Sequence, residues 1–459
     1  MTRYAAIIDN PQAFRTSSTT PLPVCLWVNP IKSNLPALTK HLANYSLGLD
    51  PMAWMRGAVR VVNWPSPGQT LAFTAGWYYV QEEIAMAAVQ ALDPQPGERI
   101  LDLCAAPGGK TAQIAVRLHN TGMVVANELH ANRLPSLSTT VMRLGLTNVV
   151  TTQGDGRTPL FPSHYFDRVL VDVPCSGEGT LRRRRSPRPW RPEHGRRMAA
   201  AQKKLLSRAL DFVKPGGVVV YSTCTFAPEE NEAVLDAVIS DRAHLEAIDI
   251  PGLRGQAGLT QWQGQSYRSD LSLAQRYFPH FNDTGGFFIA RLRRTETQQN
   301  SPLEMPETPL MPPVSLSENT PMTALNQQFG IAADALKNHQ CWSTGKRRFW
   351  LAHSVCTPPP GPMPQTIGIP IASQTNLGLK PSTAFLQRFG MFIQQNSIQL
   401  PDHEAVSKFL HGQSQSLSVS VDAGYVHVRF GPFHLGCGRY VAGKLQSQLP
   451  KTLRWVGDS

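Results

Sequence analysis

Six short runs rich in β-branched and other apolar residues alternate with longer, mixed stretches across the middle of this chain. The runs are RILDL (99–103), GMVVANE (122–128), NVVTT (148–152), DRVLVDV (167–173), GVVVYST (217–223) and GFFIARL (286–292). We expect helices in the gaps, including one from about Thr111 and one from about Pro192 to Val213. This alternation predicts a parallel, doubly wound α/β sheet. Continuous apolar runs fit strands that are buried on both faces.

Three of these strands end in segments of unusual chemistry. DLCAAPGGKT (102–111) follows the first strand, Pro174–Cys175 follows the fourth, and Thr223–Cys224 ends the fifth. Open parallel sheets bind their ligands beyond the carboxyl ends of the strands. The three segments should therefore share one rim of the sheet.

The turn after the first strand has the form of a cofactor-binding loop. Gly108 and Gly109 allow close approach to the backbone at the start of a helix, where N–H groups and the helix dipole face a ligand. The letters GGKT resemble the end of a phosphate-binding P-loop, but Cys104 stands where that motif needs its first glycine. An acid about 20 residues past the glycines suits a ribose diol. Acids follow three of the strands: Glu128, Asp155 and Asp172.

The charge balance indicates a polyanionic partner. The 459 residues include 44 Lys and Arg against 32 Asp and Glu, a formal net charge of +12. Nucleic acid is the expected partner, because phosphate contacts supply most of the non-specific affinity of such proteins. No apolar stretch approaches the roughly 20 residues that span a membrane, and the first residues lack the pattern of a secretory signal. We therefore expect no membrane association and a cytoplasmic location.

The cysteines show neither the spacing of a zinc site nor that of a disulfide framework. They form no C-x-x-C pair. We expect reduced thiols and no metal site. The seven positions are 25, 104, 175, 224, 341, 356 and 437.

The chain divides into four parts by composition. Residues 295–321 are rich in Pro, Ser and Thr without a hydrophobic period, which is typical of a linker. A weaker break, rich in Pro and Gly, lies at 63–77. The predicted parts are an N-terminal auxiliary domain (1–75), a central domain (76–294), the linker (295–321) and a C-terminal region (322–459).

A dense basic tract follows the Pro174–Cys175 segment. Six arginines lie between residues 182 and 191. A tract of this kind beside a strand end suits contact with phosphates, and Trp190 is able to stack on a base. A solvated arginine surface and a packed tryptophan are the alternatives.

Three segments carry a family resemblance. DLCAAPGGKT, VDVPCSGEGTLRR and YSTCTFAPEENE closely resemble motifs of the S-adenosylmethionine-dependent RNA cytosine-C5 methyltransferases of the NOL1/NOP2/Sun type. The resemblance runs from about Tyr78 to Arg293. It implies a Rossmann-like class I methyltransferase sheet, flanked by a small N-terminal α+β domain and a C-terminal β-rich, PUA-like domain that binds RNA. In this layout the chain is most similar to the bacterial small-subunit ribosomal RNA member.

The chemistry of that family uses two cysteines. Cytosine C5 is a weak nucleophile, so a thiolate first adds to C6 and enables C5 to attack a sulfonium methyl group. The resemblance assigns the nucleophile to Cys224 and a role in resolving the adduct to Cys175. It places Asp172 at the cytosine edge near N3.

By the same resemblance, the cofactor is S-adenosyl-L-methionine. Glu128 is expected on its ribose, Asp155 near the adenine amine and Asp172 near the methionine end. Lys110 is expected to contact the cofactor or a substrate phosphate. The loop expected against the cofactor comprises Cys104, Ala105, Ala106, Pro107, Gly108, Gly109 and Lys110.

The resulting prediction is an enzyme that methylates C5 of a cytosine in RNA. Small-subunit rRNA, or the small ribosomal subunit itself, is the expected partner. The same chemistry on tRNA is one alternative, and a non-catalytic RNA-binding factor in ribosome assembly is another. The presence of both Cys175 and Cys224 argues against a loss of catalysis.

Overall fold

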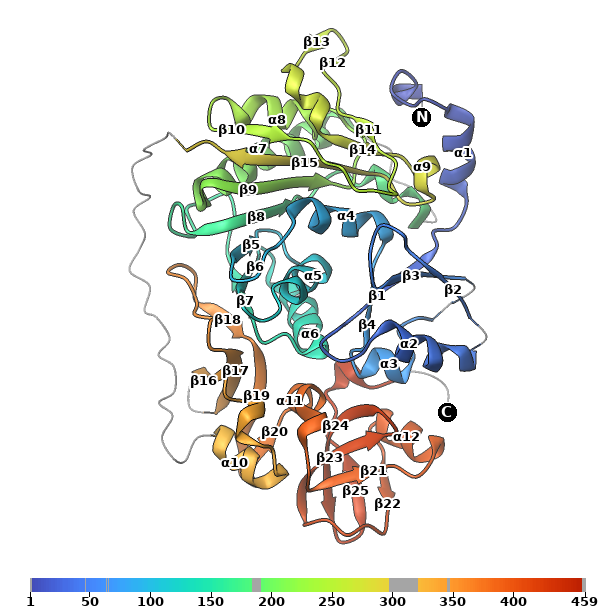
Figure 1. Cartoon of the computed structure of the whole chain (residues 1–459), viewed down its shortest axis with the longest axis vertical. Coiled ribbons are helices and arrows are strands. Elements are labelled where there is room, and N and C mark those ends of the chain that lie inside the picture. Colours follow the sequence, from blue (N-terminus) through green and yellow to red (C-terminus); the bar gives the residue numbers. More distant parts are fainter. Residues whose placement is uncertain are drawn as a thin grey trace.

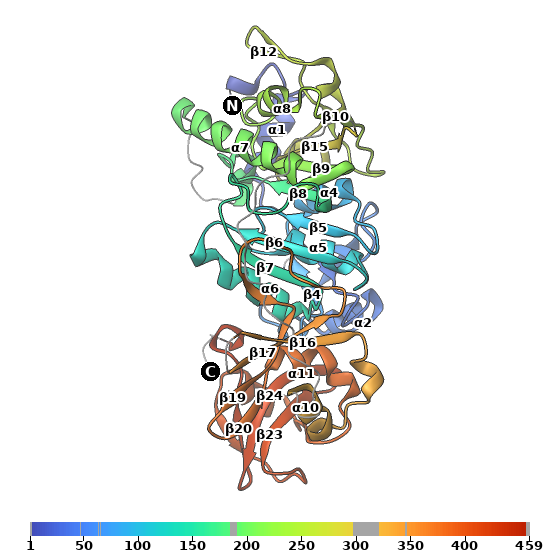
Figure 2. The ribbon, with the colours of Figure 1, turned by 90° about the vertical axis from the view of Figure 1, so that its left-hand side faces the viewer.

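The computed structural model describes residues 2–45, 47–62, 64, 66–183, 191–296, 321–344 and 347–455. A large central sheet lies toward one end of the long axis, two C-terminal sheets lie at the other end, and the small N-terminal sheet lies to the side between them (Figure 1). A quarter turn shows the same order of parts along that axis (Figure 2). The predicted linker, 295–321, falls almost entirely outside the described residues.

The central sheet contains all six predicted strands. Its core order is β15-β9-β8-β5-β6-β7. Neighbours from β9 to β7 pair in parallel, so the doubly wound α/β fold is confirmed for five of the six runs. The bounds are β5 (Arg99–Asp102), β6 (Met123–Glu128), β7 (Val149–Gln153), β8 (Phe166–Asp172), β9 (Val213–Thr223) and β15 (Phe287–Arg294).

The sixth run was wrongly expected to be parallel. Strand β15 pairs antiparallel with β9, with Phe288 opposite Thr223. It follows β14 (Gln275–Tyr277) through the short helix α9 (Pro279–Asn282), and β14 is its antiparallel neighbour on the other side. Two parallel neighbouring strands need a long crossover connection. The connection from β14 to β15 is short, so it reverses the chain and makes β15 antiparallel to β14. Strand β10 (Ala243–Glu246) also pairs with β15, and β11 (Gln256–Ala257) extends the edge beyond β14.

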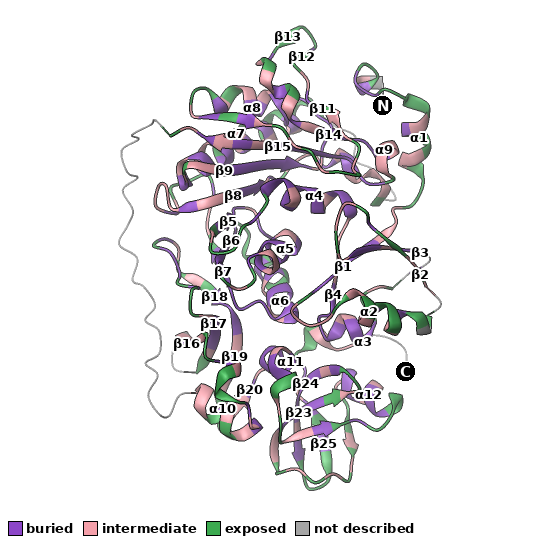
Figure 3. Ribbon diagram, in the orientation of Figure 1, coloured by how far each residue is buried: buried purple, intermediate pink, exposed green. Residues whose placement is uncertain are grey.

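Helices cover both faces of the central sheet, as the predicted fold requires. Alternate strand residues Ile100, Leu170 and Val220 pack in one core with the helices of the first face. Their neighbours Leu101 and Val169 pack in a second core with the helices of the opposite face. The strands are accordingly buried along most of their length (Figure 3). The first face carries α4 (Glu83–Leu92), α5 (Gly109–Arg117) and α6 (Leu134–Leu144), and the second α7 (Pro192–Phe212) and α8 (Glu232–Ile239).

The N-terminal part is a four-stranded antiparallel sheet with short helices. Its order is β2-β3-β1-β4. The bounds are β2 (Gly48–Pro51), β3 (Ala58–Val62), β1 (Val24–Val28) and β4 (Tyr78–Val80), with α2 (Leu35–Leu42) and α3 (Leu71–Thr74) beside them. Helix α1 (Pro11–Thr19) precedes this sheet in the chain and lies apart from it, against α9 of the central part (Figure 1). Residues from both sides of position 75 thus build one sheet.

The C-terminal part begins with α10 (Pro321–Phe329) and contains two sheets. The first has the order β16-β17-β19-β20, and the second β21-β23-β24-β25-β22. Strand β18 (Pro364–Ile367) instead pairs antiparallel with β7 and extends the central sheet. The other bounds are β16 (His339–Thr344), β17 (Arg348–His353), β19 (Ile369–Thr375), β20 (Gly378–Pro381), α11 (Thr383–Phe389), β21 (Ser397–Gln399), α12 (His403–Leu410), β22 (Ser414–Ser416), β23 (Gly424–Phe430), β24 (Phe433–Val441) and β25 (Lys444–Ser447).

The N-terminal and C-terminal parts share a core. Leu26 and Val59 of the first pack in one buried cluster with Val426 and Leu435 of the second. The ring of Phe433 lies 4.6 Å from that of Trp77. The division into domains at 75 and 294 stays a prediction, since the parts exchange strands and core residues.

Candidate active site

The carboxyl ends of β8 and β9 bring two cysteines together. Cys175 follows β8, Cys224 follows β9, and their Sγ atoms lie 3.3 Å apart at hydrogen-bonding distance. Because β8 and β9 are adjacent and parallel, the loops that leave them start side by side. Each cysteine is only partly exposed.

Backbone contacts keep the two loops in register. The Val173 N–H donates to the Ser222 carbonyl at 3.0 Å, and the Gly179 N–H donates to the Cys224 carbonyl at 2.9 Å. A Cβ at Gly179 would lie 2.2 Å from the carbonyl oxygen of Gly286, so this close approach requires glycine. The spacing of the two sulfur atoms is therefore built into the sheet and its loops.

A partly buried ion pair lies beside the cysteines. Lys110, in the first turn of α5, places its Nζ 2.7 Å from Oδ2 of Asp172 at the end of β8. The other oxygen of Asp172 accepts the Ser222 hydroxyl at 2.7 Å. Burial alone would lower the pKa of Lys110, but the Asp172 carboxylate outweighs it and raises that pKa. Lys110 therefore remains a cation.

The two thiols differ in their electrostatic surroundings. The hydrogen bond with Cys175 lowers the pKa of Cys224 below its ordinary value despite burial, and the Lys110 charge acts in the same direction. The pKa of Cys175 is raised well above its ordinary value by the same hydrogen bond, by burial and by the nearby Glu230 carboxylate. The hydrogen bond between the two sulfur atoms is the largest influence on both pKa values. Cys224 is the thiol that ionises first.

The glycine turn lies where the sequence predicted it, between the ends of β5 and β6. The Ala105 N–H donates to the Asn127 carbonyl at 2.9 Å. Gly108 precedes the first turn of α5 with a φ of 105°, a conformation that favours glycine. A Cβ at Gly109 would lie 2.8 Å from the Tyr79 ring. The turn thus opens α5 with its N-terminus free of side-chain bulk.

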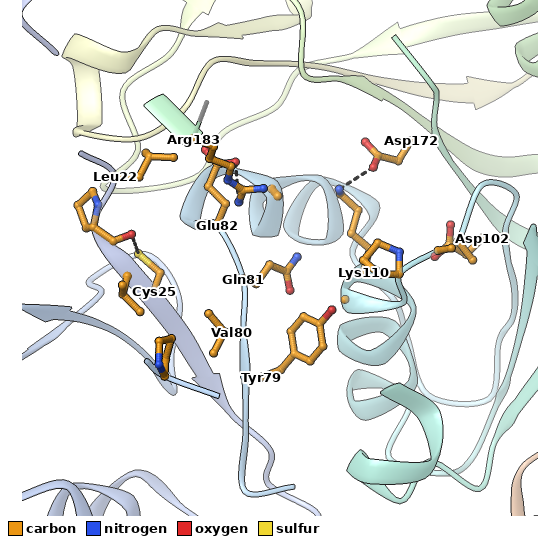
Figure 4. Close-up of a pocket in the computed structure, with 18 of the residues that line it drawn as sticks. Leu22, Cys25, Tyr79, Val80, Gln81, Glu82, Asp102, Lys110, Asp172 and Arg183 are labelled. Carbon is orange, nitrogen blue, oxygen red and sulfur yellow. Dashed lines mark hydrogen bonds and ion pairs between the residues drawn. The ribbon is translucent and has the colours of Figure 1, made fainter. Parts of the chain in front are cut away.

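A cavity of about 460 Å³ lies between this turn and the N-terminal sheet. Figure 4 shows side chains from β4, the start of α4 and the 102–110 turn pointing toward it. The predicted residues that line it are Cys104, Ala105, Ala106, Pro107, Gly109, Lys110 and Asp172. Gly108, Cys175, Cys224, Glu128 and Asp155 do not line it.

The predicted acids Glu128 and Asp155 lie on the other side of the turn. Glu128 is buried at the end of β6, where its Oε1 accepts the His130 N–H at 2.9 Å and its Oε2 lies 3.1 Å from Arg133. Asp155 follows β7, and its hydrogen bonds with Arg157 lower its pKa. Gly154, beside Asp155, donates its N–H to the Glu128 carbonyl at 3.2 Å.

The acids surround the turn closely enough to act on Cys104. Burial raises the pKa of the Cys104 thiol, and the charges of Asp102, Asp172 and Glu128 raise it further. Carboxylates around a glycine turn suit the ribose hydroxyls, amine and sulfonium of S-adenosylmethionine, and the helix N-terminus adds N–H donors. The chemistry of this set of residues therefore fits the expected cofactor.

Comparisons with known proteins place the chain in a family. The model "16S rRNA methyltransferase RsmB/F" matches residues 89–293, and the model "Methyltransferase RsmF PUA domain" matches residues 395–455. The "Ribosomal RNA small subunit methyltransferase F" of Klebsiella pneumoniae is 31% identical over 449 residues, which are 94% of this chain and 90% of that protein. The chain belongs to the RsmB/F methyltransferase family.

Other relatives align with a smaller share of the chain. The "28S rRNA (cytosine-C(5))-methyltransferase" of Mus musculus is 38% identical over 290 residues, 61% of this chain. This chain spans only 36% of that protein. A solved methyltransferase homologue from Pyrococcus horikoshii is 32% identical, with a TM-score of 0.53 over 61% of this chain and 89% of the other. The class I methyltransferase sheet and the C-terminal PUA domain expected from the motifs are confirmed.

Sequence reasoning missed Asp102 in this RsmB/F chain. Asp102 ends β5, is 1% exposed and lines the cavity. Burial raises its pKa to about 7, although the Thr111 hydroxyl donates to it at 2.6 Å. Its place as the first letter of DLCAAPGG, at a strand end, was the available signal. The interpretation assigned Cys104 to Lys110 to the cofactor and left Asp102 out.

Three further cavity residues come from β4 and from the link between β4 and α4: Tyr79, Gln81 and Glu82. Burial raises the pKa of Glu82, which accepts the Gly285 N–H at 2.7 Å and lies 3.0 Å from Arg183. Two consecutive acids, Glu82 and Glu83, at the start of an otherwise apolar helix were the signal in the sequence. Glu83 pairs with Arg60 of the N-terminal sheet.

The arginine tract corresponds only in part to the predicted phosphate-binding surface. The Arg182 side chain is 1% exposed and donates to Thr20, Pro21, Asp283 and Thr284, so it is committed within the protein. The Arg183 side chain is half exposed. Arg184, Arg185, Arg188 and Trp190 lie outside the described residues.

Three of the remaining cysteines lie in the C-terminal part, and Cys25 and Cys104 line the cavity. Cys341, Cys356 and Cys437 are buried, and all seven cysteines are free thiols. Within the described ranges, no group of three or more His, Cys, Asp or Glu side chains is arranged to hold a metal ion. The same ranges contain no helix long and apolar enough to cross a membrane.

Proposed function

We propose that this chain transfers a methyl group from S-adenosylmethionine to C5 of a cytosine in RNA, and that its substrate is small-subunit rRNA. The 3.3 Å contact between Cys175 and Cys224 carries the proposal. One of these thiols has a lowered pKa and the other a raised pKa, which suits attack on, and release from, a single pyrimidine ring. The printed name of the Klebsiella relative, which aligns with nearly the whole chain, supports the choice of rRNA.

Cys224 is the nucleophile in this proposal. Its thiolate adds to C6 of the cytosine, and the electron pair that moves to C5 makes that carbon reactive. The hydrogen bond from Cys175, and to a smaller extent the Lys110 charge, lower the pKa of this sulfur. Asp172 is oriented by Ser222 and Lys110 to meet the cytosine edge. When bound, S-adenosylmethionine supplies an electrophilic methyl group to C5.

Cys175 resolves the adduct. After methylation, the C5–H bond and the C6–sulfur bond must both break. The electron pair of the C5–H bond forms the C5–C6 double bond, and the pair of the C6–sulfur bond leaves with Cys224. The raised pKa of Cys175 keeps it a thiol, so it accepts the C5 proton while its own proton passes to the departing Cys224 sulfur, with which it is hydrogen-bonded. The proposed cofactor contacts are the 104–110 turn, with Glu128 at the ribose and Asp155 near the adenine.

RNA contact is supported by charge. A groove of about 690 Å³ between the two C-terminal sheets is lined by Arg348, Lys380, Lys451 and Arg454. Among the described residues that line it, none is Asp or Glu. Together with the net charge of +12, this groove suits a phosphate backbone.

The test uses the two cysteine variants with radiolabelled methyl donor and small-subunit rRNA. Cys224→Ala should abolish methyl transfer, whereas Cys175→Ala should accumulate a protein–RNA adduct that survives denaturation. Cys437→Ala, a buried cysteine in the C-terminal part, is the matched control and should turn over normally. If Cys175→Ala also turns over normally, the assigned roles are wrong. Bisulfite mapping of rRNA and tRNA from cells with and without the chain decides the substrate.

A further inference from the structure

Residues 2–21 form a segment, here called the N-terminal strap, that crosses from the N-terminal sheet to the loops of the two cysteines. Helix α1 lies within it, and Figure 1 shows it running beside α9 at the edge of the central sheet. Tyr4 is 5% exposed in this segment. Its hydroxyl donates to Oε2 of Glu178 at 2.6 Å. Glu178 is three residues after Cys175.

Glu178 links the strap to both cysteine loops. The Thr225 hydroxyl, in the residue after Cys224, donates to the same Oε2 at 3.0 Å. The Ser176 hydroxyl, in the residue after Cys175, lies 2.7 Å from the Thr225 hydroxyl. The hydrogen bonds therefore run from one cysteine loop through the other to a carboxylate that Tyr4 also holds.

The Glu178 carboxylate depends on the hydroxyl groups that donate to it. Burial raises the pKa of Glu178, and the hydrogen bonds from Tyr4 and Thr225 counteract that rise. Burial also raises the pKa of Tyr4, so its hydroxyl keeps the proton that it donates. Without the Tyr4 donor, the buried carboxylate loses one of the two hydroxyls that hold it ionised and in place.

Aromatic contacts hold the strap on the Cys224 loop. Phe226 lies two residues after Cys224, and its ring centroid is 6.1 Å from that of Tyr4 and 5.5 Å from that of Phe14. Phe278 stacks on its other side at 5.4 Å. These edge-to-face and stacked contacts fix the Tyr4 ring, so its hydroxyl can reach only a small region.

Ion pairs and hydrogen bonds fasten the strap at both ends. Arg3 lies 2.5 Å from Glu229, which is in the segment after Cys224. At the other end, Arg182 donates to the carbonyls of Thr20 and Pro21 at 2.9 and 2.7 Å. Arg182 belongs to the turn that follows Cys175. The strap therefore contacts the segments after both cysteines.

We propose that Tyr4 is a positioning residue that, through Glu178 and Thr225, sets the separation of the Cys175 and Cys224 sulfur atoms. A simple anchoring role would require only the aromatic contacts and ion pairs. The shared Oε2 acceptor adds a directional connection between the strap and the residue after each cysteine. The kinetic consequence rests on the proposed function, but the geometric consequence does not.

Tyr4→Phe removes one hydroxyl and keeps the ring against Phe226 and Trp262. We expect kcat for RNA methylation to fall about tenfold, the cost of one hydrogen bond to a buried charge, with KM for RNA within about twofold. The second readout is the pH dependence of iodoacetamide alkylation at Cys224, measured by peptide mass mapping in the protein without RNA. The midpoint of this pH profile should move to higher pH in the variant. The loosened pair gives Cys224 a weaker hydrogen bond from Cys175. Glu178→Gln should shift both readouts in the same direction.

Tyr45→Phe is the matched control, because Tyr45 lies in the N-terminal part beside His41 and is 43% exposed. It should match the wild type in both readouts. If Tyr4→Phe lowers the melting temperature but leaves kcat and the alkylation midpoint unchanged, the strap is only an anchor and the proposal is overturned. If the wild type methylates no RNA, the proposed function fails, and the alkylation midpoint still decides the role of Tyr4.

Discussion

The Lys110 ammonium lies 2.7 Å from the Asp172 carboxylate, and both groups act on the Cys224 thiol next to them. The cation lowers the pKa of Cys224, and the carboxylate raises it. Because Asp172 also accepts the Ser222 hydroxyl, it cannot turn toward the sulfur without losing a hydrogen bond. Asp172 has the larger effect of the two on the pKa of Cys224, so Lys110 offsets part of that effect while the pair holds the carboxylate in place for the cytosine.

Lys110→Met should make Cys224 less reactive. Removal of the cation leaves the Asp172 charge uncompensated, so the pKa of Cys224 rises, by about one unit when a neighbouring charge is removed. At a fixed pH below that value, the thiolate fraction then falls about tenfold. The rate of iodoacetamide alkylation at Cys224, measured across pH in the protein without RNA, checks this.

Lys40→Met is the control, because Lys40 is an exposed residue of α2 far along the chain from the cysteines. It should leave the alkylation profile at the wild-type position. An unchanged profile for Lys110→Met would show that Lys110 does not act on the thiol.

Arg182→Met should destabilise the protein without changing how RNA binding depends on salt. The Arg182 guanidinium fastens Thr20, Pro21, Asp283 and Thr284, and its side chain is 1% exposed. Loss of these bonds should cost roughly 1–3 kcal/mol in urea unfolding. A lower slope of log affinity against log salt in this variant would mean that Arg182 contacts phosphate after all.

The sequence predicted the centre of this molecule better than its edges. The β5 to β9 runs are continuous and apolar because both faces are covered, and that pattern is readable without tertiary information. Strand β15 has the same composition, so its antiparallel direction was not readable from the run itself. Strand β18 joins the central sheet from more than 200 residues beyond β7, and no local pattern reports such a pairing.

The candidate site shows the same contrast. Cys175 and Cys224 could be placed together because parallel neighbours end at one rim. Tyr4 and Glu178 could not, because their contact joins residues 174 positions apart. Arg182 was assigned to the RNA surface because it lies among other arginines in the sequence. Its side chain instead points toward Thr20 and Asp283, which only the fold brings close. The roles of the site residues stay predictions until the variants are measured.

The C-terminal groove should carry part of the salt dependence of RNA binding. Replacing Arg348 and Lys451 with Gln removes two cations that line it. If both side chains bind phosphates, the slope of log affinity against log salt should fall by roughly 0.7–0.9 for each phosphate that the variant no longer neutralises. Filter binding of small-subunit rRNA at several salt concentrations measures the slope.

Lys337→Gln combined with Lys408→Gln removes the same charge from the C-terminal part outside the groove. Each of these lysines lies near an acid on its own element or turn. This control should change the slope less than the groove variant. Equal slopes for the two double variants would argue against the groove as an RNA contact.

Arg276→Met should be the most damaging single change away from the cysteines. Arg276 and Glu232 form a buried ion pair, with side chains 2% and 0% exposed, and Arg276 also donates to the Phe226 carbonyl at 3.0 Å. Removing the cation leaves the Glu232 carboxylate buried without its charge partner, which should cost roughly 3–5 kcal/mol in urea unfolding.

The double variant Arg276→Met/Glu232→Leu removes both charges and should recover much of that stability, since the cost comes from the unpaired charge and not from the absence of the pair. Because Phe226 follows Cys224 by two residues, the double variant should still show a shifted alkylation profile at Cys224. Full recovery of stability together with an unchanged profile would mean that Arg276 supports the fold and not the Cys224 loop.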